Sequence, residues 1–289
     1  MDYRIRPATS DDRAAIASFT TETFEWGDYV ADAFPDWLSD PSGHLVVAVD
    51  DHDVAIGMSR GTLISPTELW LQGARVREDW RRRGVAGSMG SAVIDWARQR
   101  GARVARLLVE DWNEPARRQV MQVGLRPVAA MLRGGRTVGD ASPLPAGNGG
   151  RRVPALEQLT RAHSAEAEPA FMSWTAGPLG RAGRGLFAIG WSFRRLTTDD
   201  LVASARHEAL WAARSGWAVG ARNDETFEVS WLETGREDAV DMVRALVDLA
   251  TASGAERIAL WIPDVGWMSA AARRAGFELS GLTVFAGAV

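Results

Sequence analysis

The sequence predicts an α/β or α+β protein built around a mostly central sheet, with enough chain for about two domains. Short segments rich in β-branched residues alternate with segments in which apolar residues recur at helical spacing. At 289 residues, the chain exceeds the usual size of a single domain. Its 46% hydrophobic and 24% charged residues are typical of a globular protein and not of a disordered one.

The first quarter of the chain contains four predicted strands and one predicted helix. The strands are DYRIRPA, HLVVAVD, VAIGMSRGTLI and ELWLQGARV. The helix, DDRAAIASFTTETF, begins near Ser10 and lies between the first two strands.

A helix, a strand and a second helix are predicted next. The first helix runs from Ser88 to Arg100 because apolar side chains recur at helical spacing there, and Gly101 follows it as a C′ glycine. The strand is RVARLLVED. The second helix extends from Pro115, which suits a first helical turn, to Gly124.

A change in composition marks a boundary after these elements. The segment from Arg133 to Gly150 is rich in Gly, Pro, Ser, Asn and Asp and has no hydrophobic period. We therefore expect a linker over residues 136–150, between an N-terminal domain of residues 1–135 and a C-terminal domain of residues 151–289.

The second half repeats the end of the first. Gly101 aligns with Gly254 at an offset of 153, and Gly124 aligns with Gly276 at an offset of 152. Helices rich in Gly and Ala can resemble each other by chance. Duplication is favoured because helix, strand and turn residues repeat together.

Composition excludes several classes of function. The net charge of −4 argues against general nucleic-acid binding. The absence of cysteine excludes disulfides, thiolate metal centres and thiol nucleophiles, and the four histidines lack metal-ligand spacing, so no metal is expected. The charged N-terminal segment and the lack of a long apolar run predict no membrane association and a cytoplasmic protein.

Four arginines lie within seven residues, just before a run of small residues. They are Arg77, Arg81, Arg82 and Arg83. In the order strand, turn and helix, small residues let the backbone approach a ligand, and the unpaired N–H groups and dipole of the helix start favour a phosphate or pyrophosphate. The alternative is a solvated, charged turn. The spacing of the small residues favours the phosphate.

Other motifs fit less well. The segment AGSMG, residues 86–90, is a loose nucleophile elbow around Ser88, but the preceding DWRRRG is not an apolar strand. The sequence contains neither G-x-G-x-x-G nor a Walker sequence.

The spacing Arg81-x-x-Gly84-x-Ala86, with Val76 five residues upstream, resembles the acyl-CoA-binding signature of the GCN5-related N-acetyltransferase (GNAT) superfamily. EDWNEPARRQVMQVGLRP is similar to the next strand and helix of that family, with Asn113 at its asparagine position, and YRIRPATSDD is similar to its first strand and turn. The resemblance covers nearly all of residues 1–133. It implies two GNAT-like domains, each a central mixed sheet flanked by helices, of which the second is shortened.

The resemblance also implies where the donor binds. Its pantetheine is expected along the strand end and its pyrophosphate on the turn backbone, with acetyl-CoA or another short acyl-CoA as co-substrate and no metal. Asn113 has a second interpretation, as the cap of the helix that Pro115 begins. The predicted donor-binding residues are Ala74, Arg75, Val76, Arg81, Arg82, Arg83, Gly84, Val85, Ala86, Gly87, Ser88 and Asn113.

Catalytic groups are harder to assign. Acyl transfer needs a neutral amine and a protonated or stabilised leaving thiolate. Glu68 is the available carboxylate on the strand from which the family commonly draws its base, although a solvated strand-end residue is the alternative. The family's usual tyrosine position is Val120 here. Protonation of the thiolate would then fall to water or to another group.

The segment TTETFEWGDYVADAFPDW is expected to line the acceptor site. The predicted contacts are Glu25, Asp28, Tyr29 and Trp70, although Trp70 also suits packing. The acids suit a cationic amine, and a solvated helix face is the alternative. A small-molecule amine is preferred to a protein as acceptor, and its identity stays open.

The donor site is expected to be missing from the second half. The offset of 153 maps Arg81, Gly84 and Ala86 onto Thr234, Glu237 and Ala239, and Thr234 with Glu237 is predicted to form a capping box. WSFRRLTTDDL resembles YRIRPATSDDR, and TTDDLVASARHEALWAARSG is predicted as a helix. This degenerate half would complete the acceptor groove, bury apolar surface or make a homodimer contact.

The leading hypothesis is an N-acyltransferase, most simply an N-acetyltransferase, that acts on a primary amine and binds its donor in the N-terminal domain only. Two alternatives remain: a non-catalytic acyl-CoA-binding or regulatory protein, and a transferase that takes its acyl group from a carrier-protein thioester.

Overall fold

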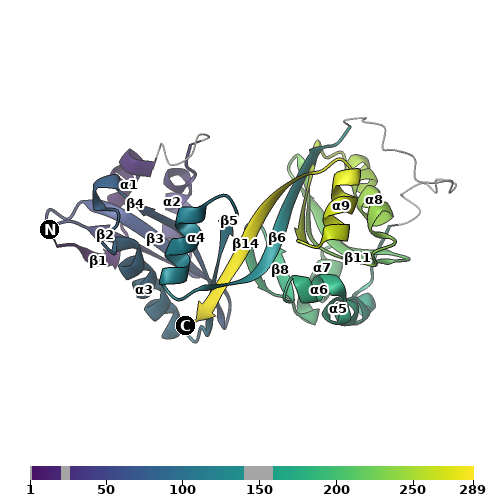
Figure 1. Ribbon diagram of the computed structural model, residues 1–289, viewed down its shortest axis with the longest axis horizontal. Coiled ribbons are helices and arrows are strands. Elements are labelled where there is room, and N and C mark those ends of the chain that lie inside the picture. Colours follow the sequence, from purple (N-terminus) through teal and green to yellow (C-terminus); the bar gives the residue numbers. More distant parts are fainter. Residues whose placement is uncertain (1, 21–26, 140–158) are drawn as a thin grey trace. The chain divides into compact units, whose positions relative to one another are not determined.

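The structure, a computed structural model, describes residues 2–20, 27–139 and 159–289, which divide into two compact units (Figure 1). Among these residues, the first unit takes those up to Leu108, Arg118–Arg126 and Phe285–Val289. The second unit takes Val109–Arg117 and those from Pro127 to Val284. The expected domain boundaries remain a prediction. The two compact units do not have the same bounds as the expected domains. Residues 127–135 go with the second unit, and the last five residues return to the first.

The first unit contains a mixed sheet in the order β1-β2-β3-β4-β5, with the last residues of β14 beside β5. Neighbouring strands from β1 to β4 are antiparallel, whereas β5 runs parallel to β4. The five strands expected in this part of the chain are all present, and the mixed sheet confirms the predicted fold class. Their bounds are β1 (Arg4–Pro7), β2 (Gly43–Val49), β3 (Ala55–Ser65), β4 (Glu68–Val76), β5 (Val104–Glu110) and β14 (Glu278–Ala288).

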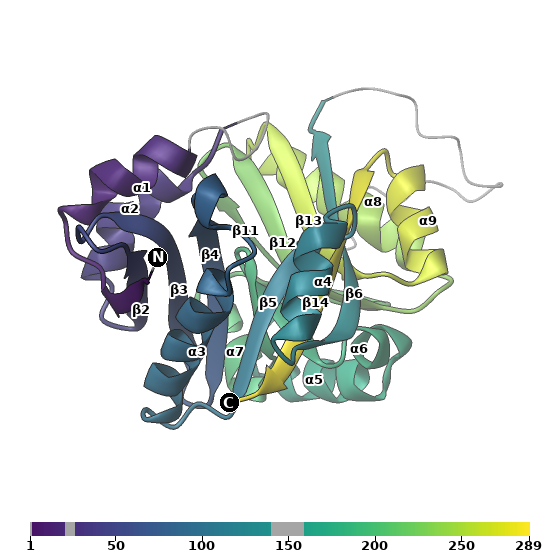
Figure 2. The ribbon, with the colours of Figure 1, turned by 60° about the vertical axis from the view of Figure 1, so that its left-hand side comes forward.

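Helices cover both faces of this sheet (Figure 2). On one face, α1 (Asp12–Thr20) and α2 (Val30–Ser39) pack Ile16 and Phe34 into a core with Met58 of β3. On the other face, α3 (Val85–Arg98) approaches β3 so closely that a Cβ on Gly61 would lie 2.3 Å from Val93. Gly61 is therefore required for this helix to reach the sheet.

The start of α3 differs from the prediction. The helix begins at Val85 and not at Ser88, so the small residues predicted as a turn form its first turn. Gly84 precedes it in the left-handed conformation, with a φ of +81°. After the helix, Gly101 has a φ of +93°, and the next amide donates to the carbonyl of Ala97 at 3.1 Å, as expected for a glycine that ends a helix.

The second unit contains a sheet in the order β14-β6-β13-β12-β11-β10-β7, and β8 and β9 form a separate two-stranded sheet. The strands are β6 (Arg126–Thr137), β7 (Thr160–Arg161), β8 (Leu186–Ile189), β9 (Ser192–Arg195), β10 (Leu210–Ala213), β11 (Gly216–Asn223), β12 (Thr226–Thr234) and β13 (Arg257–Pro263). The helices are α5 (Ala167–Ala176), α6 (Pro178–Ala182), α7 (Thr198–Arg206), α8 (Ala239–Ala252) and α9 (Gly266–Arg274), while α4 (Glu114–Gln122) is divided between the units.

No helix among the described residues is long and apolar enough to cross a membrane.

Two predicted segments are corrected here. Residues 133–137 belong to β6 and pair with β13, so the expected linker begins later than the composition suggested. Residues 140–150 lie outside the described ranges. The long helix predicted around α7 ends at Arg206, and Leu210–Ala213 form β10 instead.

The sequence repeat corresponds to repeated elements. β5 and β13 each contain 7 residues, α3 and α8 each contain 14, and α4 and α9 each contain 9. The paired glycines 101 and 254, and 124 and 276, all have a positive φ. The predicted capping box of Thr234 is wrong, because Thr234 ends β12 with its hydroxyl buried and unpartnered within the described residues, and α8 starts at Ala239 without a side-chain cap.

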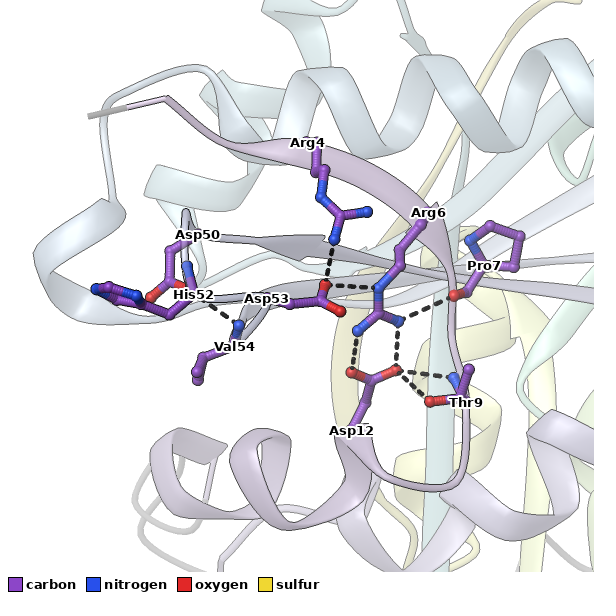
Figure 3. Close-up of polar contacts among 9 residues, drawn as sticks. All are labelled: Arg4, Arg6, Pro7, Thr9, Asp12, Asp50, His52, Asp53 and Val54. Atoms are coloured by element: carbon purple, nitrogen blue, oxygen red, sulfur yellow. Dashed lines mark hydrogen bonds and ion pairs between the residues drawn. The ribbon is translucent and has the colours of Figure 1, made fainter.

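A polar clip joins β1 to α1 (Figure 3). Arg6 donates two hydrogen bonds to Asp12, both 2.8 Å long, and the amide of Thr9 donates a third at 2.8 Å. Burial by itself raises the pKa of Asp12, but these hydrogen bonds lower it below its usual range. Arg6 also donates to Asp53 at 3.0 Å.

The same clip recurs in the second unit. Arg194 donates twice to Asp200, and the amide of Thr197 donates to the same carboxylate at 2.8 Å. The spacing Arg-x-x-Thr-x-x-Asp is identical in the two places. A repeated side-chain network supports duplication more strongly than the likeness of two helices does.

We expect Asp12→Asn to lower the free energy of unfolding by about 2 kcal/mol at neutral pH, because it removes a buried carboxylate that accepts two hydrogen bonds from Arg6, while Arg6 keeps Asp53 as a partner. The folded-state pKa of Asp12 is lowered, so ionised Asp12 stabilises the fold above the unfolded-state pKa of about 4, and this stabilisation is lost as the pH falls through the folded-state pKa. Urea denaturation at a series of pH values measures both effects. Asp11→Asn, at the exposed neighbouring position, is the control. An equal deficit at pH 3 and pH 7 would contradict an ionic origin.

Deletion of Phe285–Val289 is expected to destabilise the first unit. It removes the strand beside β5, the hydrogen bond of 3.0 Å from the amide of Val289 to Arg103, and the buried ring of Phe285. Hydrogen exchange of residues 104–108 is expected to become faster, with exchange in β11 and β12 as the internal comparison. Unchanged protection of residues 104–108 would show that the tail does not complete this sheet.

Candidate donor-binding site

Strand β4 pairs with β5 over three positions only. The pairs are Glu68 with Val104, Leu69 with Ala105, and Trp70 with Arg106. Beyond Trp70, β4 continues to Val76 without a pairing to β5, while its other edge stays paired with β3. The second half of β4 therefore presents backbone that β5 does not occupy.

A β-bulge interrupts β4 at this point. Arg75 lies opposite Met58 and Gln72 lies opposite Arg60, so β4 contains one extra residue between these two pairs. Gly73 occupies the bulge with a φ of +69°, and a Cβ there would lie 2.8 Å from the ring of Trp37. Sequence reasoning missed this glycine, although a lone glycine within a strand pattern is a known signal for a bulge.

The turn after β4 leaves a row of amides without partners. A short 3-10 helix, η1 (Glu78–Trp80), leads to Arg82 and Gly84, which both have a positive φ, and then to α3. No side chain caps α3, and within the described part of the chain the amides of residues 82–87 donate no hydrogen bond. These donors, together with the positive end of the helix dipole, suit an anion.

The arginines of the turn have different surroundings. Arg77 pairs with Asp79 at 2.7 Å, and this hydrogen bond raises the pKa of Arg77. Arg81 donates from Nε to the carbonyl of Val76 at 3.1 Å, which fastens the turn to the end of β4. Arg83 lies over the buried ring of Trp80, 5.1 Å from its centroid. These contacts give at least part of the charge cluster a structural role.

The remaining predicted donor contacts surround the same turn. Val85 is buried, and Ala86 and Gly87 are partly exposed. A Cβ on Gly87 would lie 3.8 Å from Val123, which follows α4. The hydroxyl of Ser88 lies 2.9 Å from that of Tyr3.

Two predicted donor contacts are engaged elsewhere. Asn113 caps α4 by accepting a hydrogen bond of 3.2 Å from the amide of Ala116, and it lies in the second unit. Arg75 donates to Asp28 at 2.6 Å, so the guanidinium is held by a carboxylate, while the backbone of Arg75 remains part of β4.

The predicted acceptor contacts are also altered. The side chain of Asp28 is 0% exposed, and it accepts hydrogen bonds from Arg75 and from the amide of Val30. This acid is therefore not available to a cationic amine. Tyr29 is 45% exposed and packs edge-on against Trp37, with 5.8 Å between the ring centroids. Glu25 lies outside the described residues.

Glu68 and Trp70 lie at the paired start of β4. Glu68 is buried, forms an ion pair with Arg106 and accepts a hydrogen bond of 3.0 Å from Ser65. Trp70 is 3% exposed, as the packing interpretation expects. Both carboxylate oxygens of the predicted base thus have partners. Glu68 also lies at the opposite end of β4 from Val76, eight residues away. Among the described residues, no group of three or more His, Asp or Glu side chains is placed to hold a metal ion.

Comparisons with known proteins agree with the fold described above. The model of the acetyltransferase (GNAT) family matches residues 13–122. A GCN5-related N-acetyltransferase from Sphaerobacter thermophilus is 15% identical and matches with a TM-score of 0.66 over 99% of this chain and 95% of that chain. A structure from Thermoplasma acidophilum is 16% identical and matches with a TM-score of 0.61 over 99% of this chain and 100% of that chain.

A tandem GNAT protein from the clavulanic acid biosynthesis pathway is 12% identical and matches with a TM-score of 0.57 over 99% of this chain and 98% of that chain. At these identities the structural matches show the fold alone. No curated protein matches the sequence. Residues 13–122 match the acetyltransferase (GNAT) family, and the whole chain is similar in fold to solved GNAT structures, one of them a tandem GNAT protein, which is consistent with two GNAT-like domains.

Proposed function

We propose that the first unit binds acetyl-CoA, or another short acyl-CoA, at the start of α3 and transfers the acyl group to the primary amine of a small molecule. The observation that carries this proposal is the row of unpartnered amides over residues 82–87, arranged around the left-handed Gly84. A pyrophosphate accepts hydrogen bonds from such a row. The pantetheine would then extend along residues 71–76 of β4, where the pairing with β5 has ended.

The chemistry requires little from side chains. The neutral amine attacks the thioester carbonyl, a C–N bond forms and the C–S bond breaks. The attacking nitrogen then loses one proton to water and the leaving thiolate takes up one, so no net proton is released. Placing the two reactants together provides much of the rate enhancement in such a reaction. Val120 lies at the family's usual tyrosine position, so in this proposal water protonates the thiolate.

Differences between equivalent turns support donor binding in the first unit only. The register of β12 on β13 matches that of β4 on β5, which places Trp231 at the position of Gly73. β12 also contains one extra residue at this place, Ser230, but Trp231 is buried and has no positive φ, so a large side chain stands where Gly73 has none. The turn that follows β12 has only four residues and includes the acids Glu237 and Asp238, which repel a pyrophosphate.

Calorimetric titration with acetyl-CoA tests donor binding. We expect the intact protein to bind one equivalent and the double variant Arg81→Glu, Gly84→Glu to bind at least about 100-fold more weakly, since at least two charge-assisted hydrogen bonds are lost. Arg236→Glu, in the corresponding turn of the second unit, is the matched control and is expected to bind like the wild type. Circular dichroism checks that each variant is folded. Two equivalents bound by the wild type would place donor sites in both units, and none would refute the proposal.

Glu68→Gln tests whether the candidate base acts in catalysis. Because Glu68 is bonded to Arg106 and Ser65, we expect the variant to keep the wild-type pH–rate profile while losing roughly 3 kcal/mol of stability. Arg106→Gln is the matched variant and is expected to lose stability similarly. Loss of the profile's acidic limb in Glu68→Gln, but not in Arg106→Gln, would instead establish Glu68 as the base.

A further inference from the structure

Tyr3 places a hydroxyl group at the edge of the donor-binding turn. It lies just before β1, far from the turn in sequence, and its oxygen is 2.9 Å from the hydroxyl of Ser88 in the first helical turn of α3. A Cβ on Gly84 would lie 3.7 Å from the same Tyr3 oxygen. The hydroxyl therefore sits beside both the left-handed residue and the unpartnered amides.

The ring of Tyr3 is held in this place by packing. It meets Trp80 edge-on, with 6.4 Å between the centroids and an angle of 88° between the planes. Trp80 is buried and is also contacted by Arg83, so the ring rests on a fixed residue of η1. The hydroxyl is thus positioned before any ligand arrives, which reduces the entropy lost on binding.

The two hydroxyl groups have hydrogen-bonding capacity to spare. Together they carry two hydrogen atoms, of which their mutual bond uses one. The second hydrogen remains available to an anion in the turn. A phosphate oxygen is an acceptor only, so it matches this remaining donor.

We infer that the hydroxyl pair of Tyr3 and Ser88 donates a hydrogen bond to the pyrophosphate of the acyl-CoA donor, with Tyr3 as an additional binding residue. This inference rests on the proposed function. Unlike the arginines, the pair is uncharged, so its contribution to affinity depends little on ionic strength.

The test compares Tyr3→Phe with Ser39→Ala, which removes an exposed hydroxyl group at the end of α2 that bonds, among the described residues, only to the carbonyl of Asp36. Calorimetry with acetyl-CoA is expected to give a roughly tenfold higher Kd for Tyr3→Phe at both low and high salt, as for one hydrogen bond to a charged group. Ser39→Ala is expected to keep the wild-type Kd. An unchanged Kd for Tyr3→Phe would overturn the inference while leaving the proposed function intact. A wild-type protein that binds no acetyl-CoA would refute the proposed function itself.

Two fragments of the donor locate the contact. S-acetyl-pantetheine lacks the pyrophosphate, so Tyr3→Phe is expected to bind it like the wild type. An equal loss with this fragment would indicate a general distortion of the site and overturn the inference. Acetyl-dephospho-CoA keeps the pyrophosphate, so the tenfold loss is expected to persist. A loss seen only with intact acetyl-CoA would move the contact to the 3′-phosphate and overturn the assignment.

Discussion

The conformation of Gly73 is the constraint on which the candidate site depends. Gly73 lies in the bulge of β4 with a positive φ, and the ring of Trp37 occupies the space that any Cβ would need. The bulge follows the last residue that β4 pairs with β5, and it leads the strand toward the turn and α3. A side chain at this position would strain the backbone, displace Trp37 and alter the register with β3. The direction of β4, and with it the place where a donor can lie, follows from one residue without a side chain.

The arginine-rich turn shows how charge can shape a binding site before any ligand is present. Arg81 bonds to the carbonyl that ends β4, and Arg77 pairs with Asp79. Arg83 packs on Trp80, which also supports the ring of Tyr3. The charge cluster therefore does more than attract a phosphate, because it also fixes the backbone whose amides would bind one. The positive potential and the shape of the turn are produced by the same side chains.

Patterns that depend on neighbouring residues were predicted well from the sequence. All five strands of the N-terminal part are present because alternating apolar residues require a half-buried strand. The segment from Arg133 has the composition of a loop because of Gly134 and Gly135, whereas a Cβ on Gly134 would press on Leu260 of the paired strand. Glycine usually favours loops, but here the close packing of β6 against β13 requires a residue without a side chain.

Contacts between distant residues were not predictable in the same way. The acid Asp28 is held by Arg75, 47 residues away, and Tyr3 meets Ser88, 85 residues away. From the sequence alone, Glu68 could be a solvated residue at a strand end. Its ion pair with Arg106 of β5 is visible only in the structure. In the second unit, Thr234 had the right spacing for a cap, but the strand retains it and the helix begins later. Each of these outcomes is set by tertiary structure, which local spacing does not encode.

The return of the last residues to the first unit has a consequence for the order of folding. During synthesis, β5 emerges long before the segment that lies beside it, because nearly the whole second unit is made in between. Its edge therefore remains an unpaired strand on the ribosome, available to other strands of the same or another chain. The first unit cannot complete its sheet when its own sequence has been translated. It must wait for residues 285–289, so completion of the first unit depends on prior synthesis of the second.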